Sequence, residues 1–136
     1  YISKDTNGNQ YTLYAAKGEI DQNDSNYIYL TSIKASIDLK GHDIIKINSD
    51  FGKYNINNFD TIFSKNVIIS YLDYKIKGEY LDFSVSKNLM LISKNVVLKS
   101  DNNSLKADAI EVNIIEKNMK IFMYEDDKKV KIKSFN

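Results

Sequence analysis

The stretch Ser64-Lys65-Asn66-Val67-Ile68-Ile69 returns almost unchanged as Ser93-Lys94-Asn95-Val96-Val97-Leu98, 29 residues further along the chain. The resemblance between the two copies extends well beyond these six positions. Further segments match at the same offset, or at 30 for the last pair: residues 77–83 with 106–112, 47–54 with 76–83, and 87–91 with 117–121. A repeat of this length indicates a supersecondary unit that recurs along the chain.

Each copy alternates apolar and polar residues, passes through a turn rich in Asn, Asp or Gly, and alternates again, which is typical of consecutive short strands. The clearest alternation is at residues 33–40. The pattern predicts well over ten short strands, arranged as a sandwich, a jelly roll or a solenoid-like stack. Their expected ranges are 10–16, 27–30, 33–40, 44–48, 49–54, 61–63, 67–71, 75–77, 80–85, 89–92, 96–99, 105–107, 109–115, 119–124 and 130–133.

Length and composition predict one domain over residues 1–136, with no nucleic-acid partner. The net charge is +1, charges of both signs are interspersed, and every basic residue is Lys. The absence of Arg weighs against phosphate and guanine recognition. The chain has no Cys and so no disulfide. No apolar run reaches the roughly 18 residues that cross a bilayer. Because the chain begins at Tyr1, we expect a fragment or processed form without its anchoring segment.

Residues that catalyse reactions are sparse, and the sequence predicts neither an enzyme nor a cofactor or metal site. His42 is the only histidine and lies in a predicted turn without a nucleophile to activate. The acidic loop at 21–26 lacks the glycine and glutamate of a calcium loop, which favours a solvated hairpin. Carboxylates three apart recur with the repeat, which favours a structural role over a glycosidase pair: Glu79 with Asp82, and Asp108 with Glu111.

An ordered set of short motifs resembles the LptC family of bacterial lipopolysaccharide-export proteins, which shares its repeat with the LptA and OstA-like domains. The similarity covers residues 7–133, and the order of the motifs carries it. The motifs are Asn7-Gly8-x-x-Tyr11-x-Leu13-x-Ala15, Ile47-x-Ser49-x-x-Gly52-x-Tyr54, Asn66-Val67, Leu105-x-Ala107-Asp108-x-Ile110 and Val130-x-Ile132.

This resemblance implies an all-β fold: a single-domain, twisted antiparallel β jelly roll, partly open and built from OstA-like repeats. It implies a periplasmic protein, tethered to the inner membrane by a helix absent from this chain. Such a protein receives lipopolysaccharide from the LptF/LptG transporter and passes it to LptA by strand addition. The edges that pair with partners are then expected at Tyr11, Leu13 and Ala15 and at Val130 and Ile132. An alternative interpretation of the C-terminal edge is that the Lys residues of 128–133 protect it from pairing with other chains.

The interior of such a jelly roll is a hydrophobic groove for acyl chains. Period-2 alternation gives the inward candidates, each either an ordinary core residue or a lipid contact. They are Leu13, Ala15, Ile33, Ala35, Ile37, Leu39, Ile45, Ile47, Val67, Ile69, Tyr71, Ile76, Val96, Leu98, Leu105, Ala107, Ile121 and Met123.

Two other functions remain open at this point. A soluble LptA-like bridge protein fits the same motifs. The tyrosines, among them Tyr27 and Tyr29, also allow a carbohydrate-binding or adhesive module, although aromatic residues are favoured in strands and commonly fill a β core.

Overall fold

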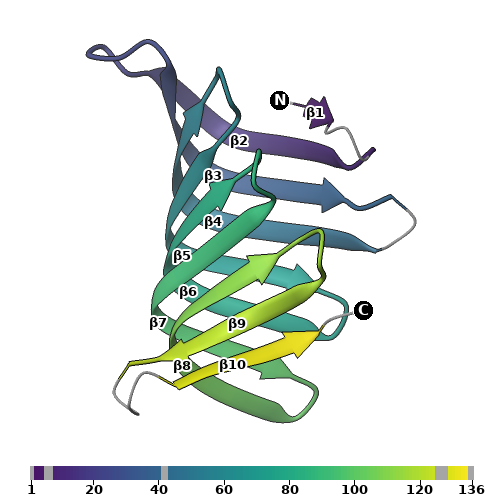
Figure 1. The fold of residues 1–136 in the computed structure, drawn as a ribbon. Coiled ribbons are helices and arrows are strands. Elements are labelled where there is room, and N and C mark those ends of the chain that lie inside the picture. Colours follow the sequence, from purple (N-terminus) through teal and green to yellow (C-terminus); the bar gives the residue numbers. More distant parts are fainter. Residues whose placement is uncertain (1, 5–7, 41–42, 125–128, 135–136) are drawn as a thin grey trace.

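The computed structural model describes residues 2–4, 8–40, 43–124 and 129–134, and these residues form one antiparallel sheet without a helix (Figure 1). Each strand pairs with its neighbours in sequence, so the order in the sheet is the order in the chain. The strands are β1 (Ile2–Lys4), β2 (Gln10–Ile20), β3 (Tyr27–Asp38), β4 (Ile44–Asn55), β5 (Thr61–Tyr71), β6 (Tyr74–Ser84), β7 (Leu89–Ser100), β8 (Asn103–Asn113), β9 (Asn118–Met123) and β10 (Lys129–Ser134).

The sheet is open, because β1 and β10 do not pair with each other, and it curls so that distant strands face one another across an apolar interior (Figure 1). This confirms the predicted all-β, twisted antiparallel and partly open fold. The connectivity is a plain meander.

The prediction of well over ten short strands was wrong, because bulges lie inside long strands where the alternation breaks. Between Ser64 and Val67, β5 has two residues, whereas the facing part of β6 between Tyr80 and Gly78 has one. The same shift recurs in β7 between Ser93 and Val96. The register shift between β4 and β5, from Asn48 to Phe51, comes from the same extra residue in β5. A bulge adds a residue and bends the strand, so the apolar period changes phase while the strand continues.

The backbone repeats with the sequence. Residues with positive φ recur 29 positions apart at the bulge, at the tight turn and at the wide turn. The pairs and triplet are Lys65 and Lys94, Asn66 and Asn95, Leu72 and Asp101, and Phe59, Asn88 and Lys117. The structure therefore aligns Asn88 with Lys117 at offset 29, and the offset of 30 read from Lys87-Asn88 and Lys117-Asn118 does not describe the fold.

Small inward residues lie beside the bulges of β5 and β7 and leave room for the corner. Val67 of β5 pairs with Gly78, and Val96 of β7 pairs with Ala107, 29 residues after Gly78. The bend divides the strands into two walls. The tight-turn wall contains the halves next to the two-residue connections 72–73 and 101–102. The wide-turn wall contains the halves next to the connections 56–60, 85–88 and 114–117.

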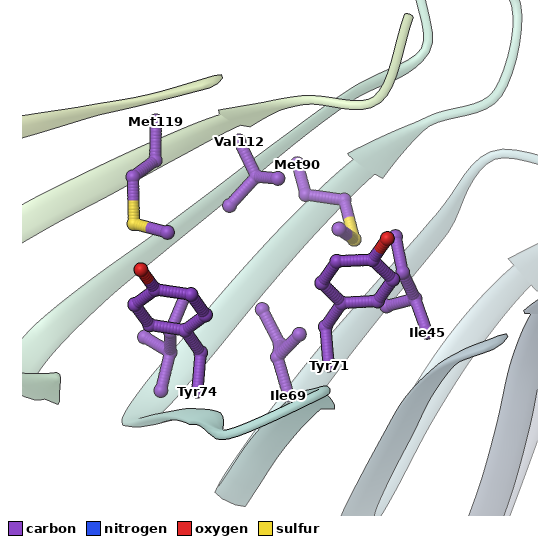
Figure 2. A pocket seen from close by; sticks show the side chains of 8 residues that line it. Ile45, Ile69, Tyr71, Tyr74, Met90, Val112 and Met119 are labelled. Atoms are coloured by element: carbon purple, nitrogen blue, oxygen red, sulfur yellow. The ribbon is translucent and has the colours of Figure 1, made fainter. Parts of the chain in front are cut away.

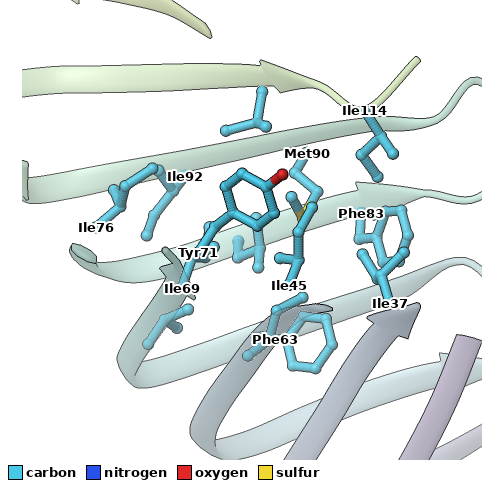
Figure 3. Packing of buried hydrophobic residues seen from close by; sticks show 14 of the residues in the cluster. Ile37, Ile45, Phe63, Ile69, Tyr71, Ile76, Phe83, Met90, Ile92 and Ile114 are labelled. Atoms are coloured by element: carbon cyan, nitrogen blue, oxygen red, sulfur yellow. The ribbon is translucent and has the colours of Figure 1, made fainter. Parts of the chain in front are cut away.

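Apolar side chains fill the space between the walls (Figure 3). Phe63 and Met90 of the wide-turn wall lie near Ile37 and Ile45 of the tight-turn wall, and all four are at most 1% exposed. The largest fully buried side chains come from β3 to β8 and the residue after β8: Phe63, Ile33, Ile37, Ile45, Ile47, Leu81, Met90, Ile92, Ile110, Ile114, Val67 and Val96.

Candidate functional site

Three pockets follow one another between the walls, and we call the space that they occupy the trough. The N-terminal pocket, of about 30 Å³, lies between the tight-turn halves of β2–β4 and the wide-turn halves of β4–β6. The central pocket, of about 20 Å³, lies between β4–β6 and β7–β9. The C-terminal pocket, of about 260 Å³, lies between β7–β8 and β9–β10. Only the C-terminal pocket approaches the roughly 300 to 1,000 Å³ of usual small-molecule sites, and the other two have room for little more than water-sized molecules.

The central pocket is entirely apolar and aromatic apart from two tyrosine hydroxyls. Figure 2 shows Met90, Val112 and Met119 on one side, opposite Ile69, Tyr71 and Tyr74 on the other. Burial, together with the nearby Asp43 carboxylate, raises the pKa of Tyr71 above its ordinary value. Such a surface offers contact area and polarisable sulfur but no acid, base or nucleophile at physiological pH.

The C-terminal pocket combines an apolar floor with a polar rim. Leu98, Leu105, Ile121 and Ile132 form the apolar part, and Ser100, Asn103, Ser104 and Lys133 supply polar groups. The Nζ atom of Lys133 lies 5.2 Å from the centre of the Tyr74 ring. One end of the trough therefore carries a cation beside apolar surface.

The expected groove residues occupy the interior with one exception. Thirteen are buried in the core, and Ala35, Leu105, Ala107 and Met123 pack against it partly buried. Ala15 is exposed. It pairs with the buried Ile33 and so shares its face, but no strand half faces β2 there among the described residues. Eleven of them line the three pockets: Leu13, Ala35, Ile37, Ile45, Ile47, Ile69, Tyr71, Ile76, Leu98, Leu105 and Ile121.

Sequence reasoning missed most of the wide-turn wall. The unforeseen lining residues are Tyr54, Phe59, Thr61, Phe63, Phe83, Val85, Met90, Val112 and Met119, with Tyr74 at the tight turn. The repeat contained a signal for one of them, Phe63. Ile121 was a candidate, and the positions 29 and 58 residues earlier are Ile92 and Phe63, which are both at most 1% exposed.

The two edges of the sheet differ. At the N-terminal edge, β1 pairs with Gln10–Thr12, so the backbone of Tyr11 already has a strand beside it, and Tyr11 and Leu13 are core residues. Beyond Thr12 the outer side of β2 has no partner strand among the described residues, and residues 14–20 are exposed. At the C-terminal edge, Val130 and Ile132 lie in β10, where Ile132 is 66% exposed.

The outer face carries an aromatic cluster near the β2–β3 loop. The Tyr29 hydroxyl donates a hydrogen bond to Asp21 at 3.0 Å, and Lys53 Nζ lies 4.4 Å from the Tyr27 ring centre and 5.7 Å from that of Tyr29. Hydrogen bonds from the Asn23 N–H and the Tyr29 hydroxyl lower the pKa of Asp21. The polar and charged groups of this cluster thus interact with its own aromatic residues. Lys53 lies over the aromatic rings on which a sugar would stack.

One of the four recurring carboxylates, Asp108, has a structural partner on the outer side of the bend. Asp108 accepts a hydrogen bond from the Tyr124 N–H at 2.6 Å, and Asp50, at the corresponding place in β4, accepts one from Asn66 Nδ2 at 2.8 Å. The described residues contain no group of three His, Cys, Asp or Glu that could hold a metal ion. His42 and Lys128 lie outside them.

In the described part of the chain, no helix is long and apolar enough to cross a membrane. No protein-family model and no curated protein sequence matches the chain.

Proposed function

We propose that the chain carries lipopolysaccharide, holding its acyl chains between the two walls of the trough, as the resemblance to LptC implies. The supporting observation is the row of three apolar pockets along an open sheet, from β2 to β10. A bound chain replaces side-chain contacts between the walls with its own, and each buried CH₂ contributes about 0.8 kcal/mol. The role needs no catalytic residue, and the energy for transport comes from ATP hydrolysis elsewhere in the export system.

The order of the walls supports strand addition at both edges. Tight-turn halves face wide-turn halves about three strands further on, and the exposed wide-turn half of β2 lacks a facing partner among the described residues. A preceding subunit of similar build would supply that partner. We propose that LptF/LptG pairs with the β2 edge and LptA with β10, which makes one continuous trough in a periplasmic bridge anchored to the inner membrane.

A pair of tyrosines tests the acyl-chain site. The photo-reactive residue p-benzoylphenylalanine replaces Tyr74 inside the trough or Tyr29 on the outer face, and each protein is irradiated with purified lipopolysaccharide. An adduct at residue 74 and none at residue 29 is the expected result. The reverse pattern would favour the alternative, a carbohydrate-binding module that uses the outer aromatic cluster.

The same reagent tests the partners. Placed at Ile132, which lies on exposed β10, it should form an adduct with LptA. Placed at Tyr14, which is 66% exposed on β2, it should form one with LptF or LptG. Adducts with LptA from both positions would favour the soluble LptA-like alternative, as would a gene without an apolar helix encoded before Tyr1.

A further inference from the structure

A buried hydrogen bond joins the two walls across the trough. The Tyr11 hydroxyl of β2 donates to Oδ1 of Asn88, in the connection between β6 and β7, at 2.6 Å, and 77 residues separate the two in sequence. Both residues are 7% exposed. The Tyr11 ring also packs against Phe83, with 5.6 Å between ring centres. Tyr11 and Phe83 line the N-terminal pocket, so the hydrogen bond lies at that end of the trough.

The backbone around Asn88 holds its side chain in place. Asn88 has a φ of 53°, and Asn tolerates this left-handed conformation better than most residues. Its N–H donates to the Val85 carbonyl at 3.2 Å, and its own carbonyl accepts from the Ile114 N–H at 2.9 Å. At the equivalent positions of the repeat stand Phe59 and Lys117. The acceptor therefore occurs in only one of the three copies, the copy that faces Tyr11.

We propose that the Tyr11–Asn88 hydrogen bond is a latch that keeps the N-terminal end of the trough closed until an acyl chain enters; this inference rests on the proposed function. An acyl chain can replace the apolar contacts between the walls, but it cannot replace a hydrogen bond. Both partners of this hydrogen bond are buried, and they come from opposite walls. Entry of an acyl chain at the β2 end therefore requires this hydrogen bond to break.

The latch can be tested without ligand, because the chain has no native cysteine. Spin labels at Tyr14→Cys on β2 and Lys87→Cys beside Asn88 report the separation of the walls by pulsed EPR; both positions are exposed. Tyr11→Phe keeps the ring and removes the donor, and Asn88→Gly keeps the positive φ and removes the acceptor. Both should shift the distribution toward longer distances. Tyr80→Phe, on the outer face of β6, is the matched control and should leave it unchanged.

The second measurement is the rate at which the fluorescent fatty acid cis-parinaric acid enters the trough. Losing a hydrogen bond of about 1 kcal/mol corresponds to roughly fivefold faster entry for Tyr11→Phe and Asn88→Gly. The double variant should gain no more than either single variant, because both remove the same interaction.

The outcomes separate the two ideas. Unchanged distances and equal entry rates in all variants, with the fatty acid still bound, would overturn the latch and leave the proposed function standing. Failure of every variant and of the unaltered chain to bind the fatty acid would count against the proposed function, and the EPR distances would still decide whether the hydrogen bond holds the walls together. Additive effects in the double variant would also overturn the latch.

Discussion

Gly78 of β6 lies so close to Ile92 of β7 that a β-carbon added to Gly78 would be 2.6 Å from Ile92 Cγ1. The glycine is buried at the inner side of the bend, where Val67 pairs with it. The close packing of β6 and β7 at the corner between the walls therefore depends on the absence of a side chain at residue 78.

Substituting Gly78→Ala should lower the free energy of unfolding by about 1–3 kcal/mol, because the extra methyl group overpacks the corner. Urea denaturation measures the change. The control is Gly18→Ala in the exposed part of β2, where the nearest contact would be an ordinary 3.4 Å from Leu30. It should be neutral or slightly stabilising, and equal effects of the two substitutions would contradict this account of the corner.

At the bulge in β7, replacing an exposed lysine by glycine should raise stability. Lys94 has a φ of 67°, a conformation that costs a residue with a β-carbon about 1–2 kcal/mol. Lys94→Gly should therefore raise the thermal midpoint, after a partial offset from the greater freedom of glycine in the unfolded chain. Lys99→Gly, at an exposed strand position of β7 without positive φ, should lower it. A fall for both would argue against the bulge conformation.

Two adjacent residues of β7 test which face is the interior. Ile92 is fully buried and Leu91 is 41% exposed. Ile92→Ala should cost about 2–5 kcal/mol of stability, as buried large-to-small substitutions do. Leu91→Ala should cost less than about 1 kcal/mol. Chemical denaturation of the two variants would show the register to be wrong if their order were reversed.

Tyr71 predicts a specific loss of stability at alkaline pH. Its folded pKa lies above the ordinary value of 10.0, chiefly through burial. The folded state therefore holds the phenol proton more tightly than the unfolded state, and this contribution is complete below pH 10.0 and is lost as the pH rises through the folded pKa. Tyr71→Phe should reduce the fall in stability that occurs as the pH rises from 10.0 through the folded pKa of Tyr71. Denaturation curves of both proteins across the alkaline range measure the difference, and parallel profiles would contradict it.

The sequence predicts the fold class because its repeat and its alternation have simple physical meanings. The match of residues 64–69 with 93–98 is a bulge with the same left-handed residues in both copies. The predicted number of strands was wrong because of the same bulge. Lys65-Asn66 interrupts the alternation as a turn would, and no local pattern tells a bulge within one strand from a loop between two.

The sequence predicts which residues of a strand point inward, but not which residues lie opposite them. Alternation places Ile45 and Ile69 on the inner face, and the structure puts both in the central pocket. Which residues face them across the trough depends on how the sheet curls, which alternation does not encode. Met90 and Met119 stand opposite because the walls are displaced by about three strands. Tyr11 and Asn88 meet over 77 residues for the same reason.

The pairing of each strand with its sequence neighbour has an evolutionary consequence. Because successive hairpins are equivalent under a 29-residue shift, duplicating or deleting one would extend or shorten the molecule without rerouting the rest, as in other repeat architectures. The reach of such a protein is then set by gene length, in steps of one hairpin, and homologues of different spans need no new fold.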